Sequence, residues 1–213
     1  MAACNAGPLS EACTAGRLVN TAAWLAIATP FALLLYDLPA GRLGANPIEE
    51  ITLRTGMTAF ALLAASLAIT PLRKLAASTT SARQLAPWIA PWRRRLGLSS
   101  FAYACLHAAT WFVLDHQLDS SAMLEDIAER RFATAGMVAF ACLCVLAATS
   151  SRAALRRLGG PTWRRIHRLA YAAGVAAGLH FLWLSKGEQL LSWAMALLVA
   201  ALLATRLVPP RRS

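Results

Sequence analysis

Charge is scarce in this sequence, and most of it has one sign. Of 213 residues, 15% are charged and 58% are hydrophobic, whereas about a quarter of the residues in a water-soluble domain are charged. The charges are clustered, and six stretches of 17 to 20 residues contain none. These stretches are 18–36, 55–72, 96–114, 132–151, 169–185 and 189–205. The composition therefore argues against a soluble globular domain.

Each uncharged stretch has the length of a membrane crossing. About 20 apolar residues in an α-helix span the hydrocarbon core of a bilayer, which is roughly 30 Å thick. Only helices and closed barrels satisfy their backbone hydrogen bonds in lipid. None of the stretches alternates in the way that a barrel strand does. The expected fold class is all-α, an integral membrane bundle of six helices.

The basic residues predict the orientation of this bundle. A net charge of +11 would suit nucleic acid, but the distribution along the chain favours another interpretation. With the N-terminus in the cytoplasm, 16 of the 21 basic residues lie on the cytoplasmic side, and nine of the ten acidic residues lie outside. This bias predicts that both termini are cytoplasmic. Membrane lipid is then the expected counter-charge, and no nucleic acid is expected as a partner.

Soluble domains and their motifs are also missing. No loop between the expected helices could hold a nucleotide-binding domain, and neither GxGxxG nor a Walker motif occurs. The five cysteines are odd in number and lack zinc or redox spacing. We expect a cytoplasmic tail at 1–17, one membrane domain at 18–207 and a cytoplasmic tail at 208–213. An interfacial segment is expected within 73–95, and a surface helix at 120–131.

Histidines inside the spans are the first functional candidates, because ionisable side chains are rare there. His107 follows Arg95 by 12 residues, and His180 follows Arg168 by 12 residues. Both therefore lie about 18 Å from the inner edge, on helices that run in the same direction. Two neutral imidazoles at one depth could ligate one heme iron from opposite sides. Alternatively, the small residues before His180 pack helices, and both histidines bond to neighbours.

His167 precedes His180 by 13 residues, which places it about 20 Å shallower and about 220° around the helix. The equivalent position before His107 is Arg94, so His167 has no histidine partner. It could ligate a second heme with another sixth ligand, contact heme propionates or a flavin phosphate beside Arg94, or be an interfacial polar residue. His116 is expected to be solvated at the outer end of the third span.

Several short motifs occur in a characteristic order. They are 44–48, Thr55-Gly56, 69–72, 94–97 running on to Tyr103 and His107, 163–171, and 180–186. Together they resemble the heme-binding membrane subunit of the periplasmic methionine sulfoxide reductase system, within the ferric-reductase-like transmembrane domains. The resemblance covers residues 18–207. One departure is Leu53, which stands where the family pattern has a histidine.

The resemblance implies an electron-transfer subunit of an oxidoreductase in the bacterial inner membrane, with substrate reduction in a partner. It implies one or two b-type hemes, with His107, His167 and His180 as iron ligands, and it implies FMN. The arginines within 93–95, including Arg94, and within 164–168 are candidates for the cofactor phosphate. Electrons would come from the quinol pool or a cytoplasmic flavin reductase. They would pass to a periplasmic molybdopterin subunit that reduces methionine sulfoxide in proteins.

Two other functions stay open at this point. A self-contained ferric or quinone reductase is one, although the missing nucleotide domain argues against direct use of NADPH. A heme-free transporter or membrane anchor is the other. A transporter should have internal repeats and charged residues at mid-membrane, and the sequence has neither.

Overall fold

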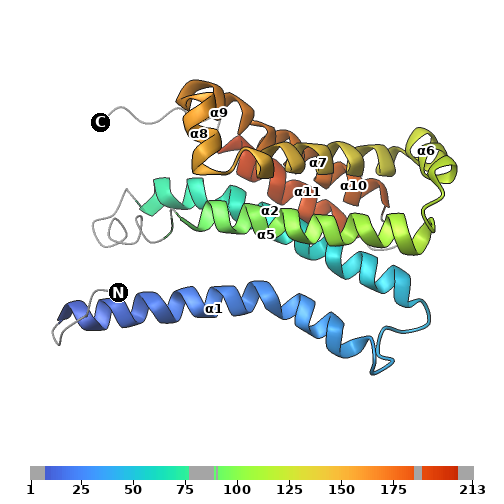
Figure 1. Ribbon diagram of the computed structural model, residues 1–213, viewed down its shortest axis with the longest axis horizontal. Coiled ribbons are helices and arrows are strands. Elements are labelled where there is room, and N and C mark those ends of the chain that lie inside the picture. The colour runs from blue at the N-terminus through green and yellow to red at the C-terminus, as the bar shows by residue number, and fades with distance from the viewer. Residues whose placement is uncertain (1–7, 77–88, 90, 185–188, 206–213) are drawn as a thin grey trace.

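The structure is a computed structural model that describes residues 8–76, 89, 91–184 and 189–205. Every regular element in these ranges is a helix (Figure 1), so the expected all-α class is confirmed. The elements are α1 (Pro8–Asp37), α2 (Pro47–Ala76), α5 (Trp92–Ala109), the π-helix η1 (Thr110–Asp115), α6 (Ser120–Glu129), α7 (Arg131–Ala148), α8 (Arg152–Leu158), α9 (Gly160–Ile166), α10 (Leu169–Leu184) and α11 (Gln189–Ala204).

Two antiparallel helix pairs form the centre of the bundle. The most extensive contacts join α2 to α5 and α7 to α10, and α11 packs on α10. In Figure 1 the long helix α1 runs along the outside of this bundle, and its contacts with α2 are sparse. The short helix α6 lies at one end of the bundle, and α8 and α9 lie at the other (Figure 1).

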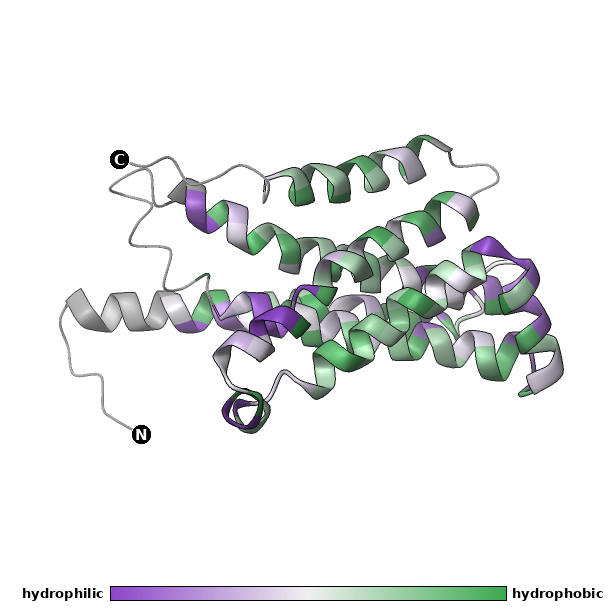
Figure 2. Ribbon diagram, turned by 90° about the horizontal axis from the view of Figure 1, so that it is seen from above, coloured by the Kyte–Doolittle hydropathy of each residue, from purple (hydrophilic) through white to green (hydrophobic). Residues whose placement is uncertain are grey.

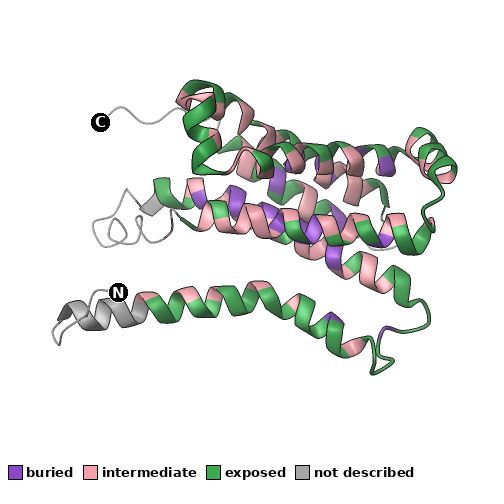
Figure 3. Cartoon of the chain, viewed as in Figure 1, coloured by how far each residue is buried: buried purple, intermediate pink, exposed green. Residues whose placement is uncertain are grey.

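The core is thin and consists largely of small side chains. Buried residues gather on the facing sides of the central helices, while α1 is mostly exposed (Figure 3). Two buried serines tie α2 to α5: the Ser100 hydroxyl donates to the carbonyl of Ala59 at 2.7 Å, and the Ser66 hydroxyl donates to that of Arg93 at 2.9 Å. Buried polar groups in this core are therefore satisfied by backbone across the helix pair.

Hydrophobic residues make up most of the long helices (Figure 2), and many of the large ones are exposed. Leu190 and Leu197, two turns apart on α11, are 86% and 64% exposed. Soluble monomers rarely expose continuous apolar surface on this scale. Four helical segments are long and apolar enough to cross a membrane, namely Gly16–Asp37, Pro47–Lys74, Trp92–Asp115 and Arg131–Ala148. Two further apolar helices, α10 and α11, are shorter, with 16 residues each.

Helix α1 is attached to the bundle at an internal proline. Pro30 has no N–H to donate, so its turn lacks one backbone hydrogen bond. The hydroxyl of Tyr103 on α5 donates to the carbonyl of Ile27 at 2.7 Å and accepts from the N–H of Phe31 at 3.2 Å. Helices bend at proline and where a side chain inserts between backbone N–H and carbonyl groups. In Figure 1, α1 bends along its length.

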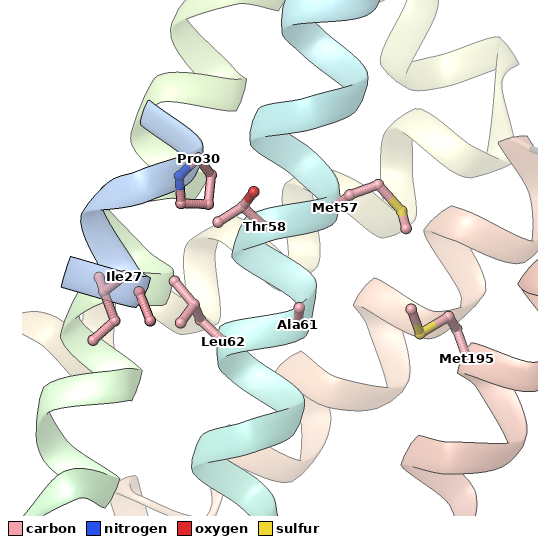
Figure 4. Close-up of a pocket in the computed structure, with 8 residues that line it drawn as sticks. Ile27, Pro30, Met57, Thr58, Ala61, Leu62 and Met195 are labelled. Carbon is pink, nitrogen blue, oxygen red and sulfur yellow. The ribbon is translucent and has the colours of Figure 1, made fainter. Parts of the chain in front are cut away.

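An apolar groove of about 370 Å³ lies beside this turn, between α1, α2 and α11 (Figure 4). It is lined by Ala26, Ile27, Pro30, Met57, Thr58, Ala61, Leu62 and Met195. Thr58 is the one polar side chain of the lining, and its hydroxyl donates to the carbonyl of Arg54 at 2.8 Å. None of the four histidines lines the groove. Its surface is therefore suited to lipid chains.

Several helix boundaries differ from those expected from the sequence. The fifth span, expected as one helix over 162–184, is divided into α9 and α10. Backbone bonds at this break connect residues three apart, including Arg168 N–H to Arg165 at 3.1 Å and Tyr171 N–H to Arg168 at 2.9 Å. Such bonds tighten the chain into a 3₁₀-like turn, which interrupts the helix. The third span begins earlier than expected, at Trp92, and ends in a π-helix.

The connecting segments agree in part with the expectations. The surface helix expected at 120–131 is α6, whose N-cap is Asp119. The short helix α8 was not expected; the hydroxyl of Ser151 caps it by accepting from Ala154 N–H at 2.9 Å. The segment 1–17, expected as a tail, is helical from Pro8. Most of the interfacial segment expected within 73–95, and the tail at 208–213, lie outside the described residues.

Candidate functional site

His107 and His180 lie next to each other between the two helix pairs, with their rings nearly perpendicular, and are called the facing pair below. His107 is on α5 and His180 on α10, and their ring centroids are 5.9 Å apart with an interplanar angle of 78°. Both residues are partly buried in the bundle. Two histidines expected at equal depth from the spacing of the sequence thus lie close together in the structure.

Each ring is oriented by a backbone carbonyl of the neighbouring helix. Nδ1 of His107 lies 2.9 Å from the carbonyl oxygen of Thr52 on α2, and Nδ1 of His180 lies 2.7 Å from that of Phe132 on α7. A carbonyl oxygen can only accept, so both Nδ1 atoms must carry the proton. In this tautomer the lone pair is on Nε2, and no bond from the described residues occupies Nε2 of either ring.

The distance between the rings fits one metal ion held from both sides. A metal–imidazole bond of about 2 Å, with roughly 1 Å more from each nitrogen to its ring centre, would put two axial imidazole centroids about 6 Å apart. The observed separation is 5.9 Å. Histidines that bind metals usually donate their other N–H to a carboxylate or carbonyl, as both rings do here. These residues fit a bis-histidine heme iron.

A π-helix begins beside His107. The buried hydroxyl of Thr110, the first residue of η1, donates to the carbonyl of His107 at 2.7 Å and accepts from the hydroxyl of Thr52 at 3.0 Å. Thr52 therefore contacts the histidine through its carbonyl and the following turn through its side chain. π-Helices are rare and occur frequently at functional sites. The sequence contains no periodic signal that would have predicted this one.

His167 is not part of the facing pair. It lies at the break between α9 and α10, where its ring stacks on Trp163 with centroids 3.8 Å apart and an interplanar angle of 25°. Its Nε2 is 3.3 Å from the hydroxyl of Thr149, and Trp163 Nε1 donates to the carbonyl of Thr149 at 2.9 Å. Thr149 was not singled out by the sequence, and Trp163 was included only as the first residue of the 163–171 motif, because neither belongs to a recognised ligand pattern.

The three arginines at the start of α5, residues 93–95, differ in their surroundings. Arg94, the expected partner of His167, is exposed. The charge of Arg93 acts on the His167 ring, and this arginine is half-buried. Arg95 bonds through its guanidinium to the side chain of Asn20 on α1 and lies over the Trp92 ring, 4.8 Å from its centroid. The arginine whose charge acts on His167 is therefore Arg93 rather than Arg94.

His116, expected to be solvated, belongs to a small cluster at the α6 end of the bundle. Its Nε2 lies 3.2 Å from a carboxylate oxygen of Asp126, whose other oxygen accepts from Arg130 at 2.8 Å. The ring also contacts Trp111, with centroids 4.5 Å apart. Through these contacts His116 joins η1 to α6.

Comparison with known proteins bears on this arrangement. Residues 55–178 match the family model described as ferric reductase like transmembrane component. Among curated proteins, the chain is similar to the protein-methionine-sulfoxide reductase heme-binding subunit MsrQ of Ralstonia nicotianae, with 40% identity over 90% of this chain and 83% of that protein. It is 39% identical to the MsrQ subunit of Rhodospirillum rubrum over 92% of this chain and 90% of that protein. For Deinococcus radiodurans MsrQ the identity is 36%, over 86% of each.

The matched segment contains most of the two helix pairs, including His107 and His167, and ends two residues before His180. The similarity to the curated proteins extends over most of both chains. Together with the four apolar helices, it makes this chain a multi-pass bacterial membrane protein. The chain belongs to the MsrQ family, within the ferric reductase like transmembrane proteins.

Proposed function

We propose that this chain carries electrons through heme held by His107 and His180, as a subunit of a protein-methionine-sulfoxide reductase system. The relatives described above bear the name of heme-binding subunits of that system. One observation carries the proposal for this chain: two imidazoles face each other at 5.9 Å, and both use Nδ1–H on a backbone carbonyl. Both Nε2 atoms are then available to one iron.

The protein's part in this function is to hold and shield the two ligands. The carbonyls of Thr52 and Phe132 select one tautomer and one ring orientation. Bound heme would supply a b-type, one-electron centre. His107 and His180 would both hold the iron, and the heme would then supply electron transfer rather than binding of a substrate. The arrangement suits electron transfer, with reduction of the substrate in a partner subunit.

The proposal includes six membrane spans with both termini in the cytoplasm, and residues 18–207 as the heme-binding domain. The acidic helix α6 and the basic helices α8 and α9 lie at opposite ends of the bundle, as the positive-inside rule expects. Helices α10 and α11 would be the fifth and sixth spans. With 16 residues each they are about 24 Å long, and the bilayer can thin locally around short spans.

A second cofactor position is proposed around His167, at the α8–α9 end. It would take either a second heme, with His167 as one ligand, or the phosphate of FMN beside Arg94. The stacked Trp163 ring and the nearby charge of Arg93 support this, since arginine is well suited to phosphates and propionates. A heme there would require His167 to give up the 3.3 Å contact with Thr149.

The donor and the acceptor are proposed from the family resemblance. Electrons would enter from the quinol pool or a flavin reductase on the cytoplasmic side. They would leave to a periplasmic molybdopterin subunit that reduces methionine sulfoxide in proteins. The His107–His180 pair lies about 18 Å from the inner edge of a core roughly 30 Å thick, and so lies nearer to the outer surface.

The test is a reduced-minus-oxidised visible spectrum with heme per chain quantified, on the purified full-length protein. The wild type should show a low-spin b-type spectrum. His107→Ala and His180→Ala should each abolish the bis-imidazole signature, whereas His116→Ala, the same change outside the pair, should retain it. His167→Ala should remove one of two hemes if the second position holds heme, and should leave the heme count unchanged if it holds FMN.

The same measurements separate the alternatives. A colourless but folded wild type would exclude the proposal and favour a transporter or membrane anchor. Retention of the complete low-spin spectrum in His180→Ala would exclude the ligand assignment. Efficient reduction of ferric ions or quinones by the isolated chain would point instead to a self-contained reductase.

A further inference from the structure

Each ring of the facing pair lies directly against a glycine of the neighbouring helix. A Cβ added at Gly56 on α2 would lie 2.9 Å from both Nδ1 and Cε1 of His107. A Cβ added at Gly136 on α7 would lie 2.7 Å from Nδ1 and 3.0 Å from Cε1 of His180. Real Cβ atoms essentially never approach another heavy atom below 3.0 Å. Neither position can therefore accept a side chain unless the imidazole moves.

Each glycine also follows, by four residues, the carbonyl that accepts from the same ring. Thr52 precedes Gly56 on α2, and Phe132 precedes Gly136 on α7. Four residues are about one helical turn, so carbonyl and glycine lie on one face of their helix. The two carbonyl–glycine pairs, Thr52–Gly56 and Phe132–Gly136, are here called seats. The seat on α2 contacts His107 of α5, and the seat on α7 contacts His180 of α10.

We propose that Gly56 and Gly136 are positioning residues, which hold His107 and His180 in the orientation that ligation of one iron requires. The inference rests on the function proposed above and names residues to which no role has been assigned. The missing side chain lets the ring lie flat enough against the helix for Nδ1–H to reach the carbonyl. That hydrogen bond in turn keeps the lone pair on Nε2.

Other reasons for a glycine do not apply at the seats. Neither glycine has a left-handed backbone, so conformational freedom is not the cause. Ordinary helix packing looks different in this bundle: a Cβ at Gly174 would meet the side chains of Leu67 and Val199, at 3.0 and 3.4 Å. At both seats, by contrast, all three of the nearest atoms belong to an imidazole.

The first experiment compares Gly56→Ala and Gly136→Ala with Gly178→Ala in the purified full-length protein. Gly178 is a matched control, because it lies two residues before His180 on α10 and an added Cβ there would meet no atom within 4 Å. The readouts are heme per chain, the low-spin signal of the ferric form and the midpoint potential. Both seat variants should lose or shift the low-spin signal and change the potential, whereas Gly178→Ala should match the wild type.

The second experiment needs no heme. Gly56→Ala is made in the wild type and in His107→Ala, and Gly136→Ala in the wild type and in His180→Ala; the thermal midpoint of each protein is measured. If the added methyl group clashes with the ring, each alanine should lower the midpoint in the wild type and have little effect once that ring is gone. A glycine variant too unstable to purify supports the seat if its histidine double variant purifies, and contradicts it otherwise.

Two results would exclude the proposed positioning role of Gly56 and Gly136. One is unchanged spectra and redox potentials in both glycine variants, and the other is an equal shift of the thermal midpoint with and without the histidine ring. Their failure can be told apart from failure of the proposed function. A colourless wild type would exclude heme-based electron transfer while the midpoint cycle still tests the clash. If the wild type contains heme and the two glycine-to-alanine variants behave like it, the proposed electron transfer stands and only the role of the seats is excluded.

Discussion

Replacing Tyr103 with phenylalanine should loosen helix α1 from the bundle. The Tyr103 side chain is only 5% exposed, and its hydroxyl is hydrogen-bonded to both Ile27 and Phe31 beside Pro30. Phenylalanine keeps the ring and its packing but removes the one group that bridges this turn. Since the remaining contacts of α1 with α2 are sparse, the effect should fall on the position of α1.

The magnitude follows from the two hydrogen bonds, at 2.7 and 3.2 Å. Losing them leaves a carbonyl and an N–H without that partner in apolar surroundings, which costs about 1 to 3 kcal/mol. The lower end applies if the turn relaxes so that Phe31 N–H bonds to Ile27 instead. For a chain of this length, each kcal/mol lowers the midpoint of thermal unfolding by about 2 to 4 °C.

The assay is thermal unfolding of the purified protein in one detergent, followed by loss of the monodisperse peak. Tyr36→Phe is the control, because it removes the same hydroxyl from a side chain that is 58% exposed and keeps the ring beside Arg42. Tyr103→Phe should also cost less when combined with Pro30→Ala, since the turn without the proline ring can straighten so that Phe31 N–H bonds to the carbonyl of Ile27. Equal midpoints for Tyr103→Phe and Tyr36→Phe would refute the reasoning.

Two further predictions concern an ion-pair cluster and a helix cap. Arg54 bonds to Asp37 at 2.6 Å and to Glu50 at 2.7 Å, so Arg54→Gln should lower the thermal midpoint. The loss should be smaller in high salt, because these ion pairs are partly exposed; a loss that does not depend on salt would contradict this. Hydrogen bonds from the Ser121 hydroxyl and the following backbone N–H groups hold the pKa of Asp119 below its usual value. The charged cap of α6 should therefore stabilise the helix above a pH of about 4 and lose this effect below it. Asp119→Ala should accelerate amide exchange in α6 at neutral pH only, and Asp119→Asn, an uncharged cap, should protect α6 at every pH.

Much of the architecture could be predicted from local sequence, because the bilayer imposes strict rules on a chain. A long apolar run without charge must become a helix in lipid, and four such helices were found with the expected composition. The surface helix near Asp119 could be predicted for a similar reason, since its pattern is local. The break at His167 could not, because three-residue backbone bonds there replace the regular helical ones, and the sequence around it has no glycine or proline to indicate a break.

The candidate site divides in the same way. Counting residues from Arg95 and Arg168 was enough to place His107 and His180 at one depth, because a helix advances by a constant rise per residue. Counting could not say which side chains of different helices face each other, and for His167 it suggested Arg94, whereas the charge that acts on this ring is that of Arg93.

The sequence by itself determined the helical class, four long apolar helices and the two histidines of equal depth, since each depends only on composition and on distance along one helix. The tertiary structure alone decided that the rings meet at 5.9 Å and that the carbonyls of Thr52 and Phe132 hold them. Every residue has a backbone carbonyl and a glycine has no side chain, so the sequence does not indicate which of these groups contacts a histidine. Only the packing of α2 on α5 and of α7 on α10 selects which carbonyl and which glycine face each ring.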